Sequence, residues 1–200
     1  YDWRMSVREA AARLTASLEA WLPELERSGQ PVHLVAHSMG GLVVRAMIGD
    51  GGAGAAVWQR IIALPKSRFV MLGTPNRGSY EAVRWLTGVN ATENKLALLD
   101  LTKGVDHIID IVGRFPGLLE LLPFAPEDRD FSDPGLWKAL KAELNGNWPI
   151  SPATTLRAAR QSWQRLLASP IDPAHMAYLA GCQSATVTDY RVERARDWDW

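Results

Sequence analysis

Apolar residues recur at helical spacing between residues 7 and 25, and this pattern predicts an amphipathic helix. The apolar positions are Val7, Ala11, Leu14, Leu18, Trp21, Leu22 and Leu25. Ser6 and Glu9 have the spacing of a capping box, which places the start of the helix at Ser6. Pro23 is expected to kink or interrupt the last turns, and Gly29 fits the C-terminal cap. We expect the apolar face to pack on a sheet.

Two short apolar runs, residues 31–36 and 68–73, predict buried parallel strands. The first run is too brief for a helix and too continuous for a half-exposed strand, so it is typical of a central strand covered on both faces. Residues 39–48 and roughly 55–64 return to helical spacing between the two runs. The order helix, strand, helix, helix, strand predicts an open α/β sheet.

About a hundred residues after the second strand lack any strand signal, and eight prolines interrupt them between residues 116 and 173. Helical pieces are expected at 136–144 and 153–168. A structureless loop of this length is uncommon inside a compact domain, so we interpret residues from about 80 to 170 as a helical cap insertion in a partial domain of residues 1–200. Residues 175–181 then return to the sheet, and residues 185–192 alternate enough for an edge strand or hairpin.

Composition narrows the classes of function. A chain of 200 residues with 47% hydrophobic content can bury the core of one domain. Its 22 basic and 22 acidic residues cancel, so no long-range field recruits nucleic acid or an anionic membrane. No window approaches the roughly 18 uncharged apolar residues of a membrane span. The single cysteine, Cys182, excludes an internal disulfide framework and a cysteine-based metal cluster.

Ser38 stands at the predicted corner between the first strand and the following helix, within Ala36-His37-Ser38-Met39-Gly40. The pattern is that of a G-x-S-x-G nucleophile elbow in which alanine replaces the first glycine. An elbow raises the serine hydroxyl above the carboxyl edge of the sheet and aims the next backbone N–H at a developing oxyanion. We therefore predict Ser38 as nucleophile and the Met39 N–H as oxyanion donor. The alternative is a chance turn of small residues.

None of the four histidines is a good general base for Ser38. His37 is adjacent to the serine and should point away from it, so we interpret it as a structural residue beside the site. His33 lies inside the predicted strand and is expected to be a hydrogen-bonded core histidine. His107 falls in the insertion and His175 opens a strand, whereas the base of such a site arrives from a loop after the last strand.

Five segments carry a family resemblance: "YDWR", "VHLVAHSMGGLVVR", "MLGTPNRGS", "FPGLLELLP" and "DPGLWKAL". They occur in the order found in the lecithin–cholesterol acyltransferase-like branch of the α/β-hydrolase lipases, and the chain resembles that family over nearly its whole length. The resemblance implies a doubly wound, mostly parallel sheet with a helical cap inserted between two strands. It also implies a serine esterase, lipase or O-acyltransferase that acts on lipid-like esters through an acyl-enzyme on Ser38, without cofactor or metal. Residues 116–123 would lie in the cap over the acyl-binding region.

The chain departs from the family at the remaining triad residues. In the family an Asp-Gly-x-Val-Pro-like segment follows the strand expected at 175–181, and the histidine comes later. The aspartates that follow this strand, all without that pattern, are Asp189, Asp197 and Asp199. No histidine follows His175, and the loop for a second oxyanion donor would precede Tyr1. We therefore expect an internal piece of a longer protein, with its acid and base beyond Trp200 and no activity on its own.

Several alternatives stay open. The parent protein could be a catalytically silent α/β-hydrolase that binds a lipid or a protein partner, or the site could act on an amide or peptide. Residues 72–80 are either a loop in which Asn76 or Arg77 shapes the floor of the site, or a turn that caps the next helix at Ser79. A group of apolar residues in the insertion could contact substrate or form plain core: Leu118, Leu119, Leu121, Leu122, Phe124 and Trp137.

Overall fold

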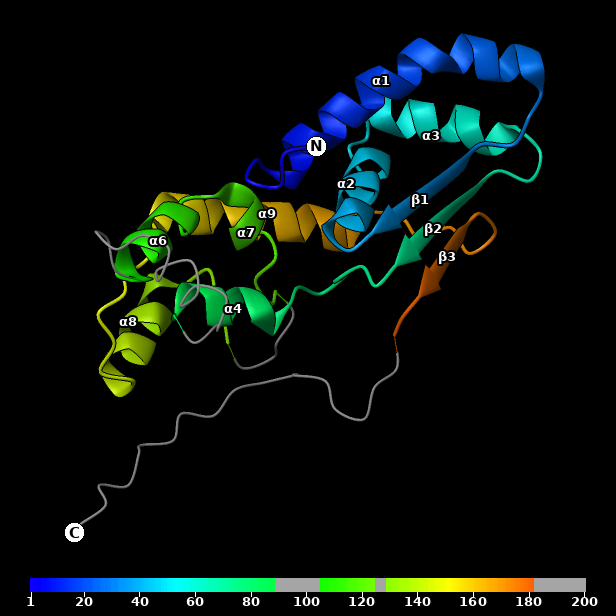
Figure 1. The fold of residues 1–200 in the computed structure, drawn as a ribbon. Helices are drawn as coiled ribbons and strands as arrows, with labels where there is room; N and C mark the ends of the chain where they lie inside the picture. Colours follow the sequence, from blue (N-terminus) through cyan, green and yellow to red (C-terminus); the bar gives the residue numbers. More distant parts are fainter. Residues whose placement is uncertain (89–104, 125–128, 182–200) are drawn as a thin grey trace.

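The computed structural model describes residues 1–88, 105–124 and 129–181. Within these residues three strands form one parallel sheet in the order β1 (His33–His37), β2 (Arg68–Leu72) and β3 (Met176–Leu179). The strands point toward the half of the molecule that holds the later helices (Figure 1). The predicted combination of helices with a parallel sheet is therefore confirmed for the described residues.

Helices separate the strands along the chain. Before β2 they are α1 (Val7–Ser28), α2 (Met39–Ile48) and α3 (Ala53–Ala63). Between β2 and β3 they are α4 (Tyr80–Leu86), α6 (Val105–Val112), α7 (Pro116–Leu119), α8 (Pro134–Glu143) and α9 (Ala153–Ala168). The helical pieces expected at 136–144 and 153–168 are thus confirmed as α8 and α9. The strand or hairpin expected at 185–192 lies outside the described residues.

Helix α1 begins and ends as its capping residues predict. The Ser6 hydroxyl accepts the Glu9 N–H at 3.1 Å, and Gly29 takes the left-handed conformation at φ 63°. The expected interruption at Pro23 is not observed, because the helix continues to Ser28. Pro23 is exposed, and the carbonyl that it leaves without a helical donor belongs to the exposed Glu19, where water can replace the lost hydrogen bond.

The buried face of α1 differs from the expected one at Trp21, which is 62% exposed. The residues that the structure buries are Val7, Ala10, Ala11, Thr15, Leu18 and Leu22. This face packs chiefly on α2 and α3, within the same apolar cluster as Phe69 and Met71 of β2. Trp21 falls outside the buried face because its neighbour Leu22 occupies the inward position.

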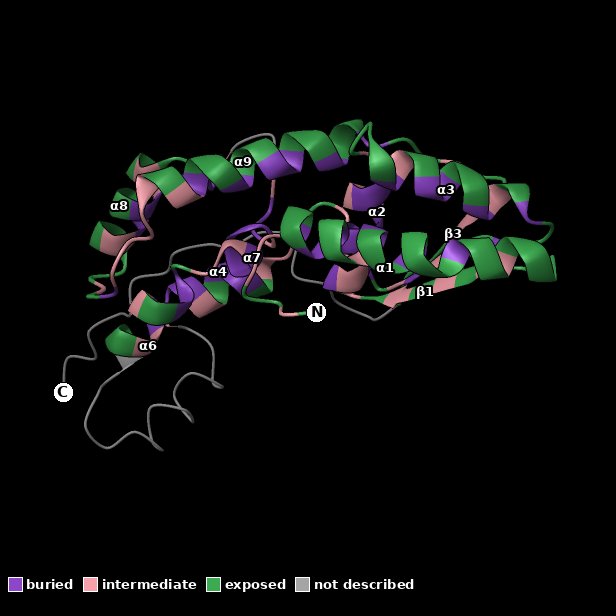
Figure 2. Ribbon diagram, turned by 90° about the horizontal axis from the view of Figure 1, so that it is seen from above, coloured by how far each residue is buried: buried purple, intermediate pink, exposed green. Residues whose placement is uncertain are grey.

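Strand β1 is an edge strand in the described part of the chain, and not the central strand that the apolar run indicates. Its residues alternate between exposed and half-buried, and Val35 is 65% exposed. Leu34 and Ala36 face the core that α1, α2 and α3 form on one side of the sheet (Figures 1 and 2). His33 is exposed and its ring bonds to no described residue, so the prediction of a hydrogen-bonded core histidine is wrong here.

Two apolar clusters hold the elements in place. One joins α1, α2 and α3 to β2 and includes Leu42, Met47, Ile61 and Phe69. The other lies among α4, α6, α7, α8 and α9. Leu121 packs against both clusters, so the two halves share one apolar boundary. None of the helices in the described ranges is long and apolar enough to cross a membrane.

Candidate active site

Ser38 occupies the corner between β1 and α2 in a conformation unusual for a residue with a side chain. Its φ is 54° and its ψ is −130°, and positive φ values in non-glycine residues often mark strained functional positions. The Ser38 N–H donates to the Leu72 carbonyl at 2.9 Å, and the Ser38 carbonyl accepts the Gly41 N–H at 3.0 Å. The sheet on one side and the helix on the other therefore fix the strained residue.

The register of the sheet places Ser38 at the edge where ligands bind in parallel α/β folds. His37 pairs with Leu72, and Leu72 pairs with Leu179, so all three strands end level with one another. Ser38, the loop after β2 and the residues after β3 consequently share the carboxyl edge of the sheet. The Met39 N–H belongs to the first turn of α2, whose N–H groups have no acceptor within the helix.

Small residues around Ser38 allow the strand and the helix to approach, and the most crowded of them is Gly41. A methyl group added to Gly40 would lie 3.7 Å from the Cβ of Ala36, an ordinary contact. Alanine at position 36 therefore fits the corner. A methyl group on Gly41 would overlap the side chain of Thr74. Close packing of α2 against the loop after β2 thus depends on Gly41.

The loop after β2 connects three elements next to Ser38. Thr74 is fully buried, and its carbonyl accepts the Tyr178 hydroxyl of β3 at 3.0 Å. Ser79 caps α4 by accepting the Glu81 N–H at 3.2 Å, as the turn interpretation predicts. Asn76 is directed to Arg45, whose Nη1 donates to its Oδ1 at 2.9 Å. The structure therefore supports the turn, and Asn76 shapes the region through Arg45.

Arg45 is a buried cation that sequence reasoning missed. It is 5% exposed, and its Nη2 donates to the Leu166 carbonyl of α9 at 2.6 Å. Within the described residues no carboxylate pairs with it, and burial lowers the pKa of its guanidinium. The Ser169 hydroxyl donates to the Arg45 carbonyl at 2.9 Å. The only signal was an arginine inside the apolar run of the helix after Ser38.

The N-terminal "YDWR" segment lies against α7 beside Met39. The Gly117 N–H donates to the Arg4 carbonyl at 3.3 Å, and a methyl group on Gly117 would overlap the Trp3 carbonyl and lie 2.9 Å from the Met39 Cε. The rings of Trp3 and Phe115 pack edge to face at 5.6 Å. An aromatic pair and the start of α7 therefore meet next to the residue that follows Ser38.

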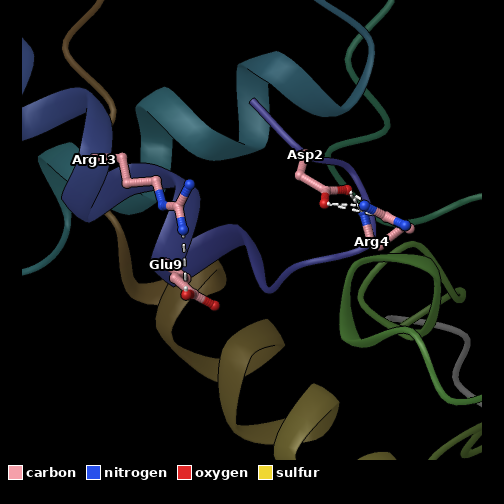
Figure 3. A network of polar contacts seen from close by, with 4 residues as sticks. All are labelled: Asp2, Arg4, Glu9 and Arg13. Carbon is pink, nitrogen blue, oxygen red and sulfur yellow. Dashed lines mark hydrogen bonds and ion pairs between the residues drawn. The ribbon is translucent and has the colours of Figure 1, made fainter.

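Ion pairs order this N-terminal segment (Figure 3). The Arg4 guanidinium donates to both carboxylate oxygens of Asp2, with Nη2 at 2.7 Å from Oδ2. These hydrogen bonds lower the pKa of Asp2 to about 2. The Glu9 side chain does not return to the Ser6 N–H as the expected capping box requires. Its Oε1 instead lies 3.9 Å from Nη2 of Arg13, one turn further along α1.

The apolar residues expected in the insertion are chiefly core. Leu118, Leu119, Leu122 and Trp137 are buried in the second apolar cluster, and Leu121 and Phe124 pack against it. Phe124 also stacks on Trp163 of α9 at 5.4 Å. These contacts support the core interpretation for the group, while substrate contact stays a prediction.

The structure brings no histidine to Ser38 among the described residues, and the Ser38 hydroxyl bonds to none of those residues. His37 and His107 are exposed on β1 and α6. The His175 Nδ1 lies 2.7 Å from Asp172 Oδ2, at the end of β3 opposite to the carboxyl edge. The three aspartates 189, 197 and 199 lie outside the described residues. The identities of the acid and the base therefore stay predictions.

The model of the family described as lecithin:cholesterol acyltransferase matches residues 1–140, which include Ser38, the loop after β2 and α7. Neither the curated proteins nor the solved structures contain a significant match to the chain.

Proposed function

Because the chain belongs to the lecithin:cholesterol acyltransferase family, we propose that it acts on lipid-like carboxylic esters with Ser38 as its nucleophile. Family membership supports an acyltransferase or esterase type of function and a lipid substrate in general terms. We add to this general function a nucleophile, Ser38, and a mechanism through an acyl-enzyme. We also extend the observed parallel sheet to a doubly wound α/β-hydrolase fold with a helical cap.

The observation that carries the proposal is the geometry of Ser38. A serine at φ 54° between a parallel strand and a helix has the placement of a nucleophile elbow. A strained conformation persists only when its surroundings fix it, and here a ladder hydrogen bond to Leu72 and the first turn of α2 do so. The strain in the Ser38 backbone is explained if the serine hydroxyl has to be presented at the carboxyl edge of the sheet.

The proposed reaction follows from this placement. The Ser38 Oγ forms a bond to the ester carbonyl carbon, while its proton passes to a general base supplied from outside the described residues. The carbonyl oxygen takes up the negative charge and accepts the Met39 N–H at the positive end of α2. The tetrahedral intermediate then breaks its bond to the alcohol, which leaves with the proton. Water or another alcohol then attacks the acyl carbon and gives its proton to the base. The bond to Ser38 Oγ breaks, and the serine takes the proton back.

A catalytically silent protein that binds a lipid or protein partner is the second candidate. It is favoured by the lack of any histidine next to Ser38 in the described part of the chain. A serine without its base retains little of the activity of a triad. The two candidates predict different outcomes for substitution at Ser38.

The test is ester turnover by the protein expressed from its complete reading frame. Ser38→Ala should lower kcat/KM for a short-chain p-nitrophenyl ester by about a thousandfold or more. Ser17→Ala, which removes the hydroxyl of an exposed serine on α1, is the matched control and should leave the rate unchanged. Equal rates in wild type and Ser38→Ala would refute the proposed nucleophile, and a wild type with no turnover would favour the silent candidate.

A further inference from the structure

A pocket of about 450 Å³ lies between α1, the C-terminal end of α2 and α9. Its walls include the small residues Ala11, Ala12 and Ala46, and their short side chains leave the space open. A volume of this size accommodates a small organic ligand. Ala46 is eight residues beyond Ser38, so it lies about 12 Å along α2 from the proposed nucleophile. The pocket is thus separate from the candidate active site.

Two arginines line this pocket from opposite helices. Arg8 belongs to the first turns of α1 and Arg165 to the last turn of α9. Both are exposed, and neither forms an ion pair with any described residue. Some other exposed arginines are paired, such as Arg4 with Asp2 and Arg60 with Glu26. Arg8 and Arg165 therefore keep their donors available on the two sides of one cavity.

The carboxylates near the pocket already have donors. Asp50 lines the pocket, and its carboxylate accepts the backbone N–H groups of Gly52, Gly54 and Ala55 at 2.7 to 3.0 Å. Burial raises the pKa of Asp50, but these three donors outweigh it and hold the pKa below its usual value. Its carboxylate is therefore ionised and held at the start of α3, and its negative charge offsets part of the positive charge of the two arginines.

Glu120 is the second carboxylate, and it is buried at 4% exposure behind the pocket residue Ser162. It accepts the Val7 N–H and the Ser162 hydroxyl. Its oxygens thus face protein donors, and the guanidinium groups of Arg8 and Arg165 outnumber the one carboxylate, that of Asp50, which lines the pocket.

We propose that this pocket binds a phosphate ester, with the phosphate between Arg8 and Arg165 and the organic group against Ala11, Ala12 and Ala46. Planar guanidinium groups match phosphate oxygens, and two of them from different helices hold a dianion better than one. The chain as a whole is neutral, so the attraction is local to this pocket. The ligand is either a soluble phosphate ester or the phosphate of a lipid headgroup.

Two binding measurements test the site. One is calorimetric titration with glycerol 1-phosphate and with inorganic phosphate. The other is co-sedimentation with phosphatidylcholine vesicles that contain phosphatidic acid. The wild type should bind at least one of these probes in a saturable, salt-sensitive manner. The double substitution Arg8→Gln, Arg165→Gln should weaken that binding about tenfold or more. Saturation by glycerol 1-phosphate alone would identify a soluble ester, and arginine-dependent binding to vesicles alone would identify a headgroup.

Two further variants separate the pocket from general charge effects. Arg157→Gln removes another exposed arginine of α9 that does not line the pocket, and the variant should bind as the wild type does. Ala12→Leu fills the pocket without changing charge and should weaken binding as the double substitution does. Wild-type affinity in the double variant, equal loss in Arg157→Gln, or no saturable binding of any probe would overturn the proposal. Ser38→Ala should bind normally, because the site does not rest on the proposed nucleophile.

Discussion

Gly40 and Gly41 both follow Ser38, yet the structure gives them different roles. Gly41→Ala should lower the free energy of unfolding by about 2 kcal/mol or more, because the added methyl group overlaps Thr74 in a packed interior. Gly40→Ala should be neutral or slightly stabilising, because its methyl group meets Ala36 at 3.7 Å and alanine favours the helix. Urea unfolding of the two variants measures both changes in the free energy of unfolding. Equal effects of the two substitutions would show that the described packing of α2 is incorrect.

Glu120 makes a pH-dependent contribution to stability. Burial raises its pKa above the usual value of 4.5, although the Val7 N–H and the Ser162 hydroxyl partly oppose the shift. The folded protein therefore binds this proton more tightly than the unfolded chain does. Its contribution to the free energy of unfolding is highest at low pH and declines as pH rises from about 4.5 through the raised pKa.

Glu120→Gln should remove this decline, because the side chain no longer ionises. Urea unfolding at about pH 4 to 8 measures the stability of this variant and of wild type. The control is Glu143→Gln, which changes an exposed glutamate of α8. The stability of Glu120→Gln relative to wild type should rise with pH, and that of Glu143→Gln should stay flat. A falling difference for Glu120→Gln would mean that the carboxylate is stabilised by its surroundings.

Arg45 acts between elements, since it joins α2 to the loop after β2 and to α9. Arg45→Lys should lower the free energy of unfolding by roughly 2 kcal/mol, because one ammonium group cannot replace a fork that reaches both Asn76 and Leu166. Arg27→Lys, at an exposed position on α1, is the control and should change little. Thermal and urea unfolding measure the difference, and a stable Arg45→Lys protein would contradict the bridging role.

Local capping chemistry explains why the helix boundaries were predictable. Ser6, Gly29 and Ser79 lie at the ends of helices where their side chains or backbone conformations satisfy free backbone groups. These interactions involve residues close in sequence, so the sequence pattern contains them. Pro23 shows the limit of the rule, because water can replace the hydrogen bond that the proline removes on this exposed face.

Across the whole molecule, the less predictable features join residues far apart in the chain. The Glu120 carboxylate meets the Val7 N–H, and Arg45 meets Leu166, across more than a hundred residues in each case. The apolar run of β1 indicated strand formation correctly, but hydropathy alone does not say which strands lie beside it. The order of strands, the exposure of His33 and the use of Arg45 therefore required the structure, whereas the placement of Ser38 at a strand-to-helix corner did not.

We propose above all that Ser38 is the nucleophile of a lipid-acting member of its family. The most direct measurement is labelling of the protein, expressed from its complete reading frame, with a fluorophosphonate, followed by mass spectrometry of its peptides. We expect one modified serine, Ser38, and loss of labelling in Ser38→Ala but not in Ser17→Ala. Labelling of another serine, or unchanged labelling in Ser38→Ala, would contradict it.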